Sequence, residues 1–166
     1  METRLVVADS GPLIIWARLG RLNLLRTVCG EIWVPTSVEY EVVNDPRRPG
    51  AAAVLTALTN GLLVRPPPLE NDDLQTTRYP TLGPGESAAI RLAIRLKCPV
   101  LIDEKRGRAV AKAHKIPVID TLGVLLTARQ RGHIDRIKPV LEQMAEMKYF
   151  TSAALYEAVL QKSGEQ

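Results

Sequence analysis

Three aspartates of this chain stand where a short apolar segment gives way to polar residues. Asp9 follows the apolar run 5–8, Asp103 follows the run 99–102, and Asp120 follows a third run with a weaker pattern. A strand that is covered on both faces does not tolerate an internal carboxylate, so an aspartate after its last residue is expected at the rim of a sheet. Asp also follows strands as a turn former or a helix cap. The repetition at Asp9 and Asp103 favours a shared site over two unrelated turns.

Glutamates add candidates for the same rim. Glu86 follows Gly85 in the first turn of an expected helix, where its charge complements the helix dipole, although a lone Glu there is usually only a dipole partner. Glu39 and Glu41 are two residues apart on another expected helix, so they point to different sides. Spacing alone does not say which of the two faces the rim.

A cluster built only from carboxylates suits a particular chemistry. Oxygen ligands without His or Cys neighbours favour hard cations such as Mg²⁺ or Mn²⁺ and disfavour zinc. Carboxylates brought together without a cation repel one another, so a metal ion is their natural partner. The reaction that needs this arrangement is phosphodiester hydrolysis, in which bound ions generate hydroxide and stabilise the leaving oxygen. The single histidines His114 and His133 are expected in surface or helix-end roles rather than in catalysis.

The elements that must position these acids alternate along the chain. The patterns predict strands joined by short connections and helices, which is typical of a parallel sheet covered by helices on both faces, with ligands beyond the carboxyl ends of the strands. The Pro-rich stretch 65–85 is interpreted as a loop or lid. The expected strands are 5–8, 32–34, 62–64, 99–102 and 116–119, and the expected helices are 12–25 with a break at Gly20, 36–43, 51–58, 86–96, 104–114, 121–131, 139–147 and 152–161.

Composition limits the class of protein. The chain has 166 residues, of which 46% are hydrophobic, enough for one domain with a sizeable core. The sequence shows no apolar stretch long enough for a membrane span and no export signal. Cys29 and Cys98 are interpreted as reduced thiols in the core. We therefore expect a soluble cytoplasmic protein. The net charge of +4 permits a polyanionic partner. The aromatic residues are not interleaved with basic ones, which argues against a base-stacking platform and for backbone contacts.

Several short segments form an ordered set along the chain. They are LVVADSGPLI at 5–14, Val34-Pro35 with Val38 and Glu41-Val42, GESAAI at 85–90, LIDE at 101–104, TLGVL at 121–125 and the ending with ALYE at 154–157, Val159-Leu160 and Gly164-Glu165. Together they resemble a prokaryotic PIN-domain subgroup related to VapC toxins. The resemblance runs nearly from end to end, and its strength lies in the ordered set rather than in one motif. It implies a three-layer fold with a five-stranded parallel sheet of order 3-2-1-4-5, flanked by helices and followed by C-terminal helices.

The resemblance also implies roles for individual residues. Asp9, Glu41, Glu86 and Asp103 match the catalytic acids of the family, and Asp9, Asp103, Glu86 and Glu104 are the expected ligands of Mg²⁺ or Mn²⁺. The match departs at Lys105, where related toxins often carry a further Asp, so Glu104 substitutes or a second ion is weak or absent.

Three residues are candidates for binding substrate. Ser10 is expected either to orient the Asp9 carboxylate or to cap the first helix. Arg106 and Arg108 are candidates for binding RNA phosphates, although a solvated helix face accounts for them too.

These expectations describe a metal-dependent endoribonuclease, the toxin of a toxin–antitoxin pair, with an RNA substrate, a cognate antitoxin, a homodimeric state and no membrane association. Residues 1–150 are expected to form the nuclease domain, and residues 151–166 a helical extension packed on it or at a dimer interface. The alternatives are an RNA-processing nuclease and a catalytically weak RNA-binding or interaction module. A receiver domain is disfavoured because Ser10 follows Asp9 where an acidic pair is needed, and a haloacid-type phosphatase because Gly11 stands where a second Asp is needed.

Overall fold

The structure is a computed structural model that describes residues 4–67, 79–149 and 152–165. The chain forms two compact units, Met1–Thr121 (unit 1) and Leu122–Gln166 (unit 2), and each is described by itself. No helix in the described ranges has the length and apolar character needed to cross a membrane. The expected division at residue 150 stays a prediction.

The sheet of unit 1 is parallel and has the order β2-β1-β3-β4. Its strands are β1 (Leu5–Ala8), β2 (Glu31–Trp33), β3 (Val100–Leu101) and β4 (Val118–Ile119). The central strand β1 is a continuous apolar run because it is covered on both faces, and Val7 and Ala8 are fully buried. The predicted neighbours, the first strand and the strand before Asp103, lie side by side as expected.

The described residues form four strands, whereas the sequence predicted five. The predicted strand 62–64 contributes only one parallel bridge, between Val64 and Trp33 at the outer side of β2. The backbone N–H of Leu62 donates to the Asn60 side chain, and that of Leu63 donates to the Ala57 carbonyl. Because the end of the preceding helix uses these two donors, little of the segment remains to pair with β2. The position of the bridge still agrees with the predicted strand order.

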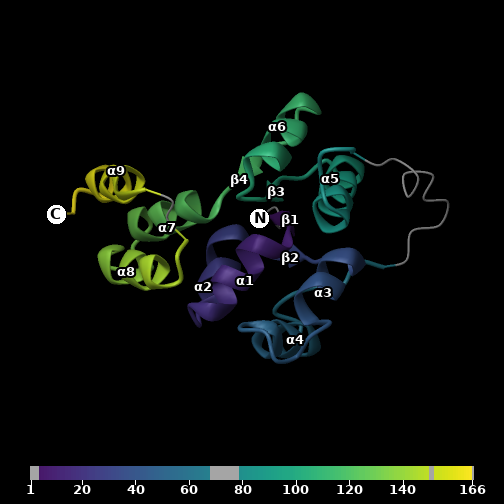
Figure 1. Cartoon of the computed structure of the whole chain (residues 1–166), viewed down its shortest axis with the longest axis horizontal. Coiled ribbons are helices and arrows are strands. Elements are labelled where there is room, and N and C mark those ends of the chain that lie inside the picture. The colour runs from purple at the N-terminus through teal and green to yellow at the C-terminus, as the bar shows by residue number, and fades with distance from the viewer. Residues whose placement is uncertain (1–3, 68–78, 150–151, 166) are drawn as a thin grey trace. The chain divides into compact units, whose positions relative to one another are not determined.

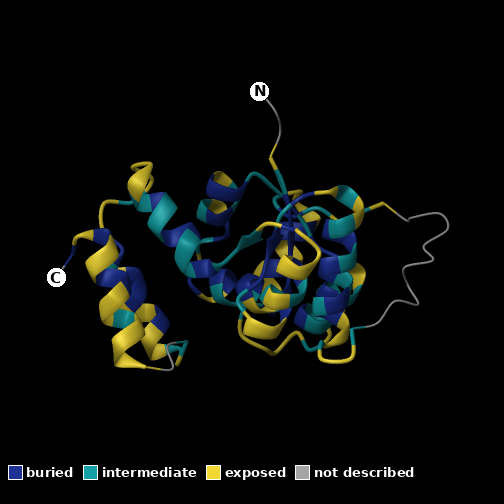
Figure 2. Cartoon of the chain, turned by 90° about the horizontal axis from the view of Figure 1, so that it is seen from above, coloured by how far each residue is buried: buried dark blue, intermediate teal, exposed yellow. Residues whose placement is uncertain are grey.

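The helices of unit 1 cover the sheet on both sides, and Figure 1 shows α1 and α5 on either side of β1. Helix α5 packs against β1, β3, α3 and α6, whereas α1 packs against α3 and α4, and α2 against β2. Trp16, Leu25 and Ile90 are fully buried between these layers, and Figure 2 shows the buried residues gathered around the strands. The helices are α1 (Ser10–Arg18), α2 (Leu22–Cys29), α3 (Thr36–Val43), α4 (Ala51–Thr59), α5 (Pro84–Leu96) and α6 (Lys105–Ala113).

The break predicted at Gly20 is confirmed, because α1 ends at Arg18 and α2 begins at Leu22. Gly20 has a φ of +68°, a conformation that glycine adopts without the steric penalty of a side chain. Of the stretch predicted as a loop or lid, residues 68–78 lie outside the described residues. Its end is a turn in which the backbone N–H of Leu82 donates to the carbonyl of Tyr79.

Unit 2 contains α7 (Thr121–Gln130, which starts at the last residue of unit 1), α8 (Lys138–Glu146) and α9 (Ala153–Ser163). Its apolar residues are buried at helical spacing, among them Leu125, Leu141 and Leu160. These helices agree with the amphipathic segments predicted from the sequence, each to within two residues at either end.

Candidate functional site

Strand pairing brings two of the predicted acids to the same edge of the sheet. The backbone N–H of Asp9 donates to the Leu101 carbonyl over 2.9 Å, so β1 and β3 end at the same level. Asp103 comes two residues after Leu101, also beyond the carboxyl end of its strand. The two aspartates therefore meet at the rim where parallel sheets place ligands.

The structure separates the two glutamates that spacing could not distinguish. Oε1 of Glu41 accepts the backbone N–H of Gly85 over 2.8 Å, at the start of α5. A methyl group at position 85 would overlap the Glu41 carboxylate, which explains why a glycine is needed there. Glu39 instead pairs with Arg65, with N–O distances from 2.9 to 3.1 Å. Glu41 is thus the glutamate of α3 that belongs to the rim.

The carboxylate of Glu86 is influenced by nearby acids and by one cation. Burial raises the pKa of Glu86, and the charges of Glu104 and Glu41 raise it further. The guanidinium of Arg106 opposes this shift. Of the two predicted arginines, Arg106 is therefore the one whose charge reaches the carboxylates. Glu104 faces Glu86, and its charge is not among the causes that shift Asp9.

Asp9 is the most buried acid of the cluster, with a residue exposure of 4%. Burial is the main cause that raises its pKa to about 7. The backbone N–H of Ser10 opposes the shift, whereas the charges of the other acids, Glu86, Glu41 and Asp103, reinforce it. Oδ1 of Asp9 is buried and has no hydrogen-bond partner within the described part of the chain. A buried polar oxygen without a partner is unfavourable, so Oδ1 of Asp9 is suited to bind a proton or a cation.

Several helices begin at this rim, and the starts of two of them donate a backbone N–H to a carboxylate, which partly compensates the repulsion between the acids. The side chains at the N-caps of α1 and α6 make no capping hydrogen bond. Asp9 and Glu104 are the residues at the N-caps of α1 and α6, Glu41 accepts from the start of α5, and Asp103 accepts from the start of α7.

Thr121 is a residue of the rim that the sequence analysis missed. Its backbone N–H donates to Oδ1 of Asp103 and its hydroxyl to Oδ2, both over 2.7 Å. Thr121 is fully buried, so this two-point contact fixes the plane of the Asp103 carboxylate. A threonine directly after the fifth predicted strand was the available signal, but a hydroxyl there is also an ordinary feature of a helix start.

The other predicted substrate residues lie in different settings. Arg108 is half-buried, and its Nη1 lies 3.7 Å from Oδ2 of Asp120, so these two side chains pair beside the rim. Ser10 acts on Asp9 through its backbone N–H. The orienting role predicted for the Ser10 hydroxyl stays a prediction.

The chemistry of these acids suits a divalent cation, although their side chains are not arranged as a formed metal site. Among the described residues, no group of three or more His, Cys, Asp or Glu side chains is arranged to hold a metal ion. The donor set is nevertheless made of hard oxygens, and the unpartnered Oδ1 of Asp9 faces the charges of three other acids. A hard cation satisfies that oxygen and removes the repulsion, so the residues fit Mg²⁺ or Mn²⁺.

A comparison with known protein families shows to which family the chain belongs. A family model described as PIN domain matches residues 5–165, nearly the whole chain. The chain belongs to the PIN-domain family. Members of this family are generally nucleases that typically use divalent metal ions. No curated protein matches the chain.

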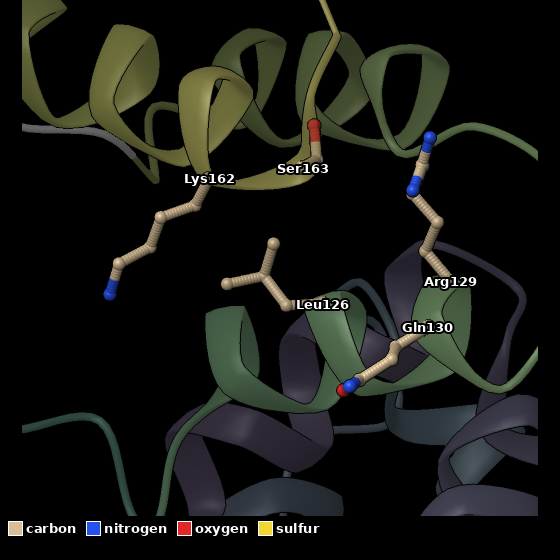
Figure 3. A pocket seen from close by; sticks show the side chains of 5 residues that line it. All are labelled: Leu126, Arg129, Gln130, Lys162 and Ser163. Carbon is tan, nitrogen blue, oxygen red and sulfur yellow. The ribbon is translucent and has the colours of Figure 1, made fainter.

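The PIN-domain protein also has a hollow that differs chemically from the carboxylate rim. A pocket of about 350 Å³ lies within unit 2, between the ends of α7 and α9 (Figure 3). Its lining includes the cations Arg129 and Lys162 and contains no acid. This pocket therefore does not offer the oxygen donors that a hard cation requires.

Proposed function

We propose that this PIN-domain protein is a metal-dependent endoribonuclease that hydrolyses RNA phosphodiester bonds with Mg²⁺ or Mn²⁺. The observation that carries the proposal is the Asp9 carboxylate, which is buried, lacks a partner at Oδ1 and faces three further acids. Such an arrangement is unfavourable for the empty protein, with a pKa near 7 for Asp9, and becomes favourable when a cation is present. The family match supports nuclease activity in general.

Each residue of the rim has a distinct task in the proposed reaction. Asp9 and Asp103 would hold the metal ion, with Glu86 as a further ligand, and Glu104, whose charge acts on Glu86, would be the candidate ligand of a second ion. A bound divalent ion supplies charge neutralisation at the phosphate and a lowered pKa for the attacking water. Glu41, held by its bond to Gly85, is placed to orient a water molecule.

The surrounding residues position these groups. Thr121 fixes the Asp103 carboxylate through its two hydrogen bonds. The guanidinium of Arg106 acts electrostatically on Glu86, which makes it the candidate to bind a nonbridging phosphate oxygen. Arg108 is held by Asp120 and is the weaker candidate for direct contact with RNA.

The finer parts of the proposal rest on the sequence resemblance. It favours RNA over DNA, and it supports a toxin that forms a homodimer and is inhibited by an antitoxin peptide offering a basic side chain to the acids. An RNA-processing nuclease without a toxin role is the second candidate. Expression of the chain alone in a host cell distinguishes the two, because a toxin slows growth and the Asp9→Asn variant relieves the effect.

The nuclease proposal is tested by incubating a mixed RNA pool with the protein and Mg²⁺ or Mn²⁺. Asp9→Asn and Asp103→Asn keep the side-chain size and remove one charge each, so we expect cleavage to fall by about a hundredfold or more. Glu86→Gln and Glu41→Gln should also lower the rate, and Asp120→Asn should lower it less. Gel electrophoresis of the RNA gives the rate.

Glu157→Gln on the exposed side of α9 is a matched control, because it removes one acid outside the rim. Its cleavage rate should equal that of the wild type. Circular dichroism verifies that every variant is folded. Cleavage that persists in excess chelator, or that is indifferent to both aspartate variants, would contradict the proposed mechanism.

A further inference from the structure

Two parts of unit 1 run beside each other, the segment 79–86 and helix α6. At the start of α6, Oε2 of Glu86 lies 3.8 Å from the position that a Cβ atom of Gly107 would occupy. Just after the last turn of α6, the ring of Tyr79 meets the ring of His114, with centroids 5.6 Å apart. Seven residues separate the two contacts in either segment, and that length of helix covers about 10 Å. A path along α6 thus joins the carboxylate cluster to an aromatic pair.

The stretch of α6 and its flanks is positively charged. From Glu104 to Lys115 it has a single acid, at its start beside the carboxylate rim, and five cations. Arg106 opposes the charge of Glu86, and the exposed Lys112 lies near the other end of α6. Cations on a helix that begins at a phosphodiester-cleaving rim attract the phosphates of the adjoining nucleotides. The five cations are Lys105, Arg106, Arg108, Lys112 and Lys115, of which Arg108 is paired with Asp120.

The aromatic pair adds a second kind of contact at the end of α6. The planes of the two rings meet at 67°, an edge-to-face arrangement that holds one ring against the other. His114 is exposed and Tyr79 is half-buried, so the pair is anchored on one side and open to solvent on the other. Flat rings beside phosphate-binding cations are the combination that binds single-stranded RNA by base stacking.

The order of residues along the chain indicated no such platform, because the aromatic residues are not interleaved with the basic ones. Order along the chain does not reveal which distant segments meet. The fold places Tyr79 beside His114, which is 35 residues further along the chain.

We propose that Tyr79 and His114 form a base-stacking subsite for single-stranded RNA, reached along α6 from the carboxylate rim. The proposal rests on the proposed function and adds where the strand runs: the cleaved phosphodiester lies at the acids, and an unpaired base a few nucleotides away stacks on the ring pair. The subsite recognises an unstacked base of any identity, because every base has a flat face. Substrates should therefore need an unpaired nucleotide at a fixed distance from the cut.

Binding is measured first, in chelator, by fluorescence anisotropy of a labelled single-stranded RNA of about ten nucleotides. Loss of one stacking partner in His114→Ala should weaken binding by about five- to tenfold. His114→Phe keeps a flat ring and should bind within about twofold of the wild type. The matched control is His133→Ala, which removes the other histidine of the chain, from an exposed position in unit 2, and should leave binding unchanged.

A second measurement separates stacking from a merely structural role of the ring pair. The same RNA is made with one base at a time replaced by hydrogen, which keeps every phosphate. Wild-type protein should lose affinity at one position, and His114→Ala should show no further loss when that same base is missing. Equal losses for both proteins at every position, or a His114→Phe variant as weak as His114→Ala, would overturn the stacking subsite.

The outcomes for the subsite and for the nuclease are distinguishable. Metal-dependent cleavage together with wild-type binding by His114→Ala removes the subsite and leaves the proposed function. Binding that depends on His114 without any cleavage supports the subsite and removes the nuclease. A wild-type protein that neither binds nor cleaves single-stranded RNA overturns both.

Discussion

Asp9 in unit 1 and Glu165 in unit 2 are both buried carboxylates, and they have opposite surroundings. Oδ1 of Asp9 has no partner in the described residues, and nearby acids add to the burial that raises its pKa to about 7. Glu165 accepts the backbone N–H groups of Ile137 and Lys138 over 2.7 and 2.9 Å, and the Nε of Arg129 over 3.0 Å. Burial acts to raise the pKa of Glu165, but these donors outweigh it and lower the pKa.

This contrast distinguishes an acid that stabilises the fold from one that the fold only tolerates. The carboxylate of Glu165 satisfies backbone donors at the start of α8 and neutralises a cation, so it ties the chain's end to the rest of unit 2. Asp9 contributes no comparable contact through Oδ1. A buried carboxylate without a hydrogen-bond partner is expected at a functional site, where a bound ligand supplies the partner.

The largest effect that we expect in this comparison is a loss of stability on replacing Glu165. Glu165→Gln removes the charge and turns an N–H group toward donors, so the free energy of unfolding should fall by about 3 kcal/mol. Because the pKa of Glu165 is lowered in the folded state, its contribution is present above its ordinary value near 4.5 and is lost as the pH falls through the folded value. Urea denaturation followed by circular dichroism measures the change.

The matched control for this prediction is Glu157→Gln, an exposed acid of the same helix region, which should change stability by less than about 0.5 kcal/mol. RNA cleavage per folded molecule should be unaffected by Glu165→Gln, because Glu165 is not part of the carboxylate rim. Equal stabilities of the two variants would mean that Glu165 does not have the structural role assigned to it.

An effect of the opposite sign is expected for Asp9. In chelator near pH 7.5, Asp9→Asn should raise the free energy of unfolding by about 1–3 kcal/mol, because the variant no longer buries a charge among other acids. The folded pKa of Asp9 is raised, so the wild type loses stability as the pH rises from about 4 to about 7, and Asp9→Asn should lack this part of the slope. Thermal unfolding across this pH range measures the difference.

Two controls sharpen the Asp9 prediction. Asp135→Asn, at an exposed acid in unit 2, should keep the wild-type slope. Added Mg²⁺ should stabilise the wild type more than Asp9→Asn, since only the intact rim binds the ion well. A variant less stable than the wild type in chelator would show that Asp9 is satisfied in the folded protein and would remove the contrast with Glu165.

The sequence was sufficient to predict the parts of the fold that depend on local pattern. Short apolar runs predicted the four strands, and a strand must end before a buried carboxylate, which placed Asp9 and Asp103 at the rim. The strand at 62–64 was overestimated because its donors are used by the end of α4, a competition that an apolar pattern does not reveal. Strand order came from resemblance to the family, since periodicity does not specify which strands pair.

The side-chain contacts between distant segments could not be predicted from the sequence. Residue spacing did not distinguish Glu41 from Glu39, and Glu41 was named only through the resemblance to the family; the contact with the N–H of Gly85, 44 residues further along the chain, was not predicted. The ring pair of Tyr79 and His114 likewise joins segments whose proximity no local pattern encodes. Thr121 was overlooked for the same reason, because its partner Asp103 is 18 residues earlier in the chain, after strand β3.

Thr121 provides the smallest effect and the most selective test of how the rim differs from the Glu165 contact. Thr121→Val has nearly the same shape and keeps the backbone N–H that donates to Oδ1 of Asp103, but it loses the hydroxyl that donates to Oδ2. Residues that orient metal ligands typically change affinity or activity by about 10- to 100-fold, and here one of two bonds remains. We therefore expect a roughly tenfold rise in the Mg²⁺ concentration needed for half-maximal cleavage, with a stability loss of about 1 kcal/mol.

The Mg²⁺ concentration needed for half-maximal cleavage shows whether the Thr121 hydroxyl positions Asp103 or only contributes to packing. A purely structural role would lower the amount of folded protein without changing the Mg²⁺ concentration for half-maximal cleavage, because the surviving molecules would have an intact rim. Thr121→Ser restores the hydroxyl and should recover most of the wild-type metal dependence, while Thr127→Val in α7 should leave it unchanged. If Thr121→Val has the metal dependence of the wild type, the hydroxyl bond to Asp103 is structural, and Asp103 then resembles Glu165 more closely than Asp9.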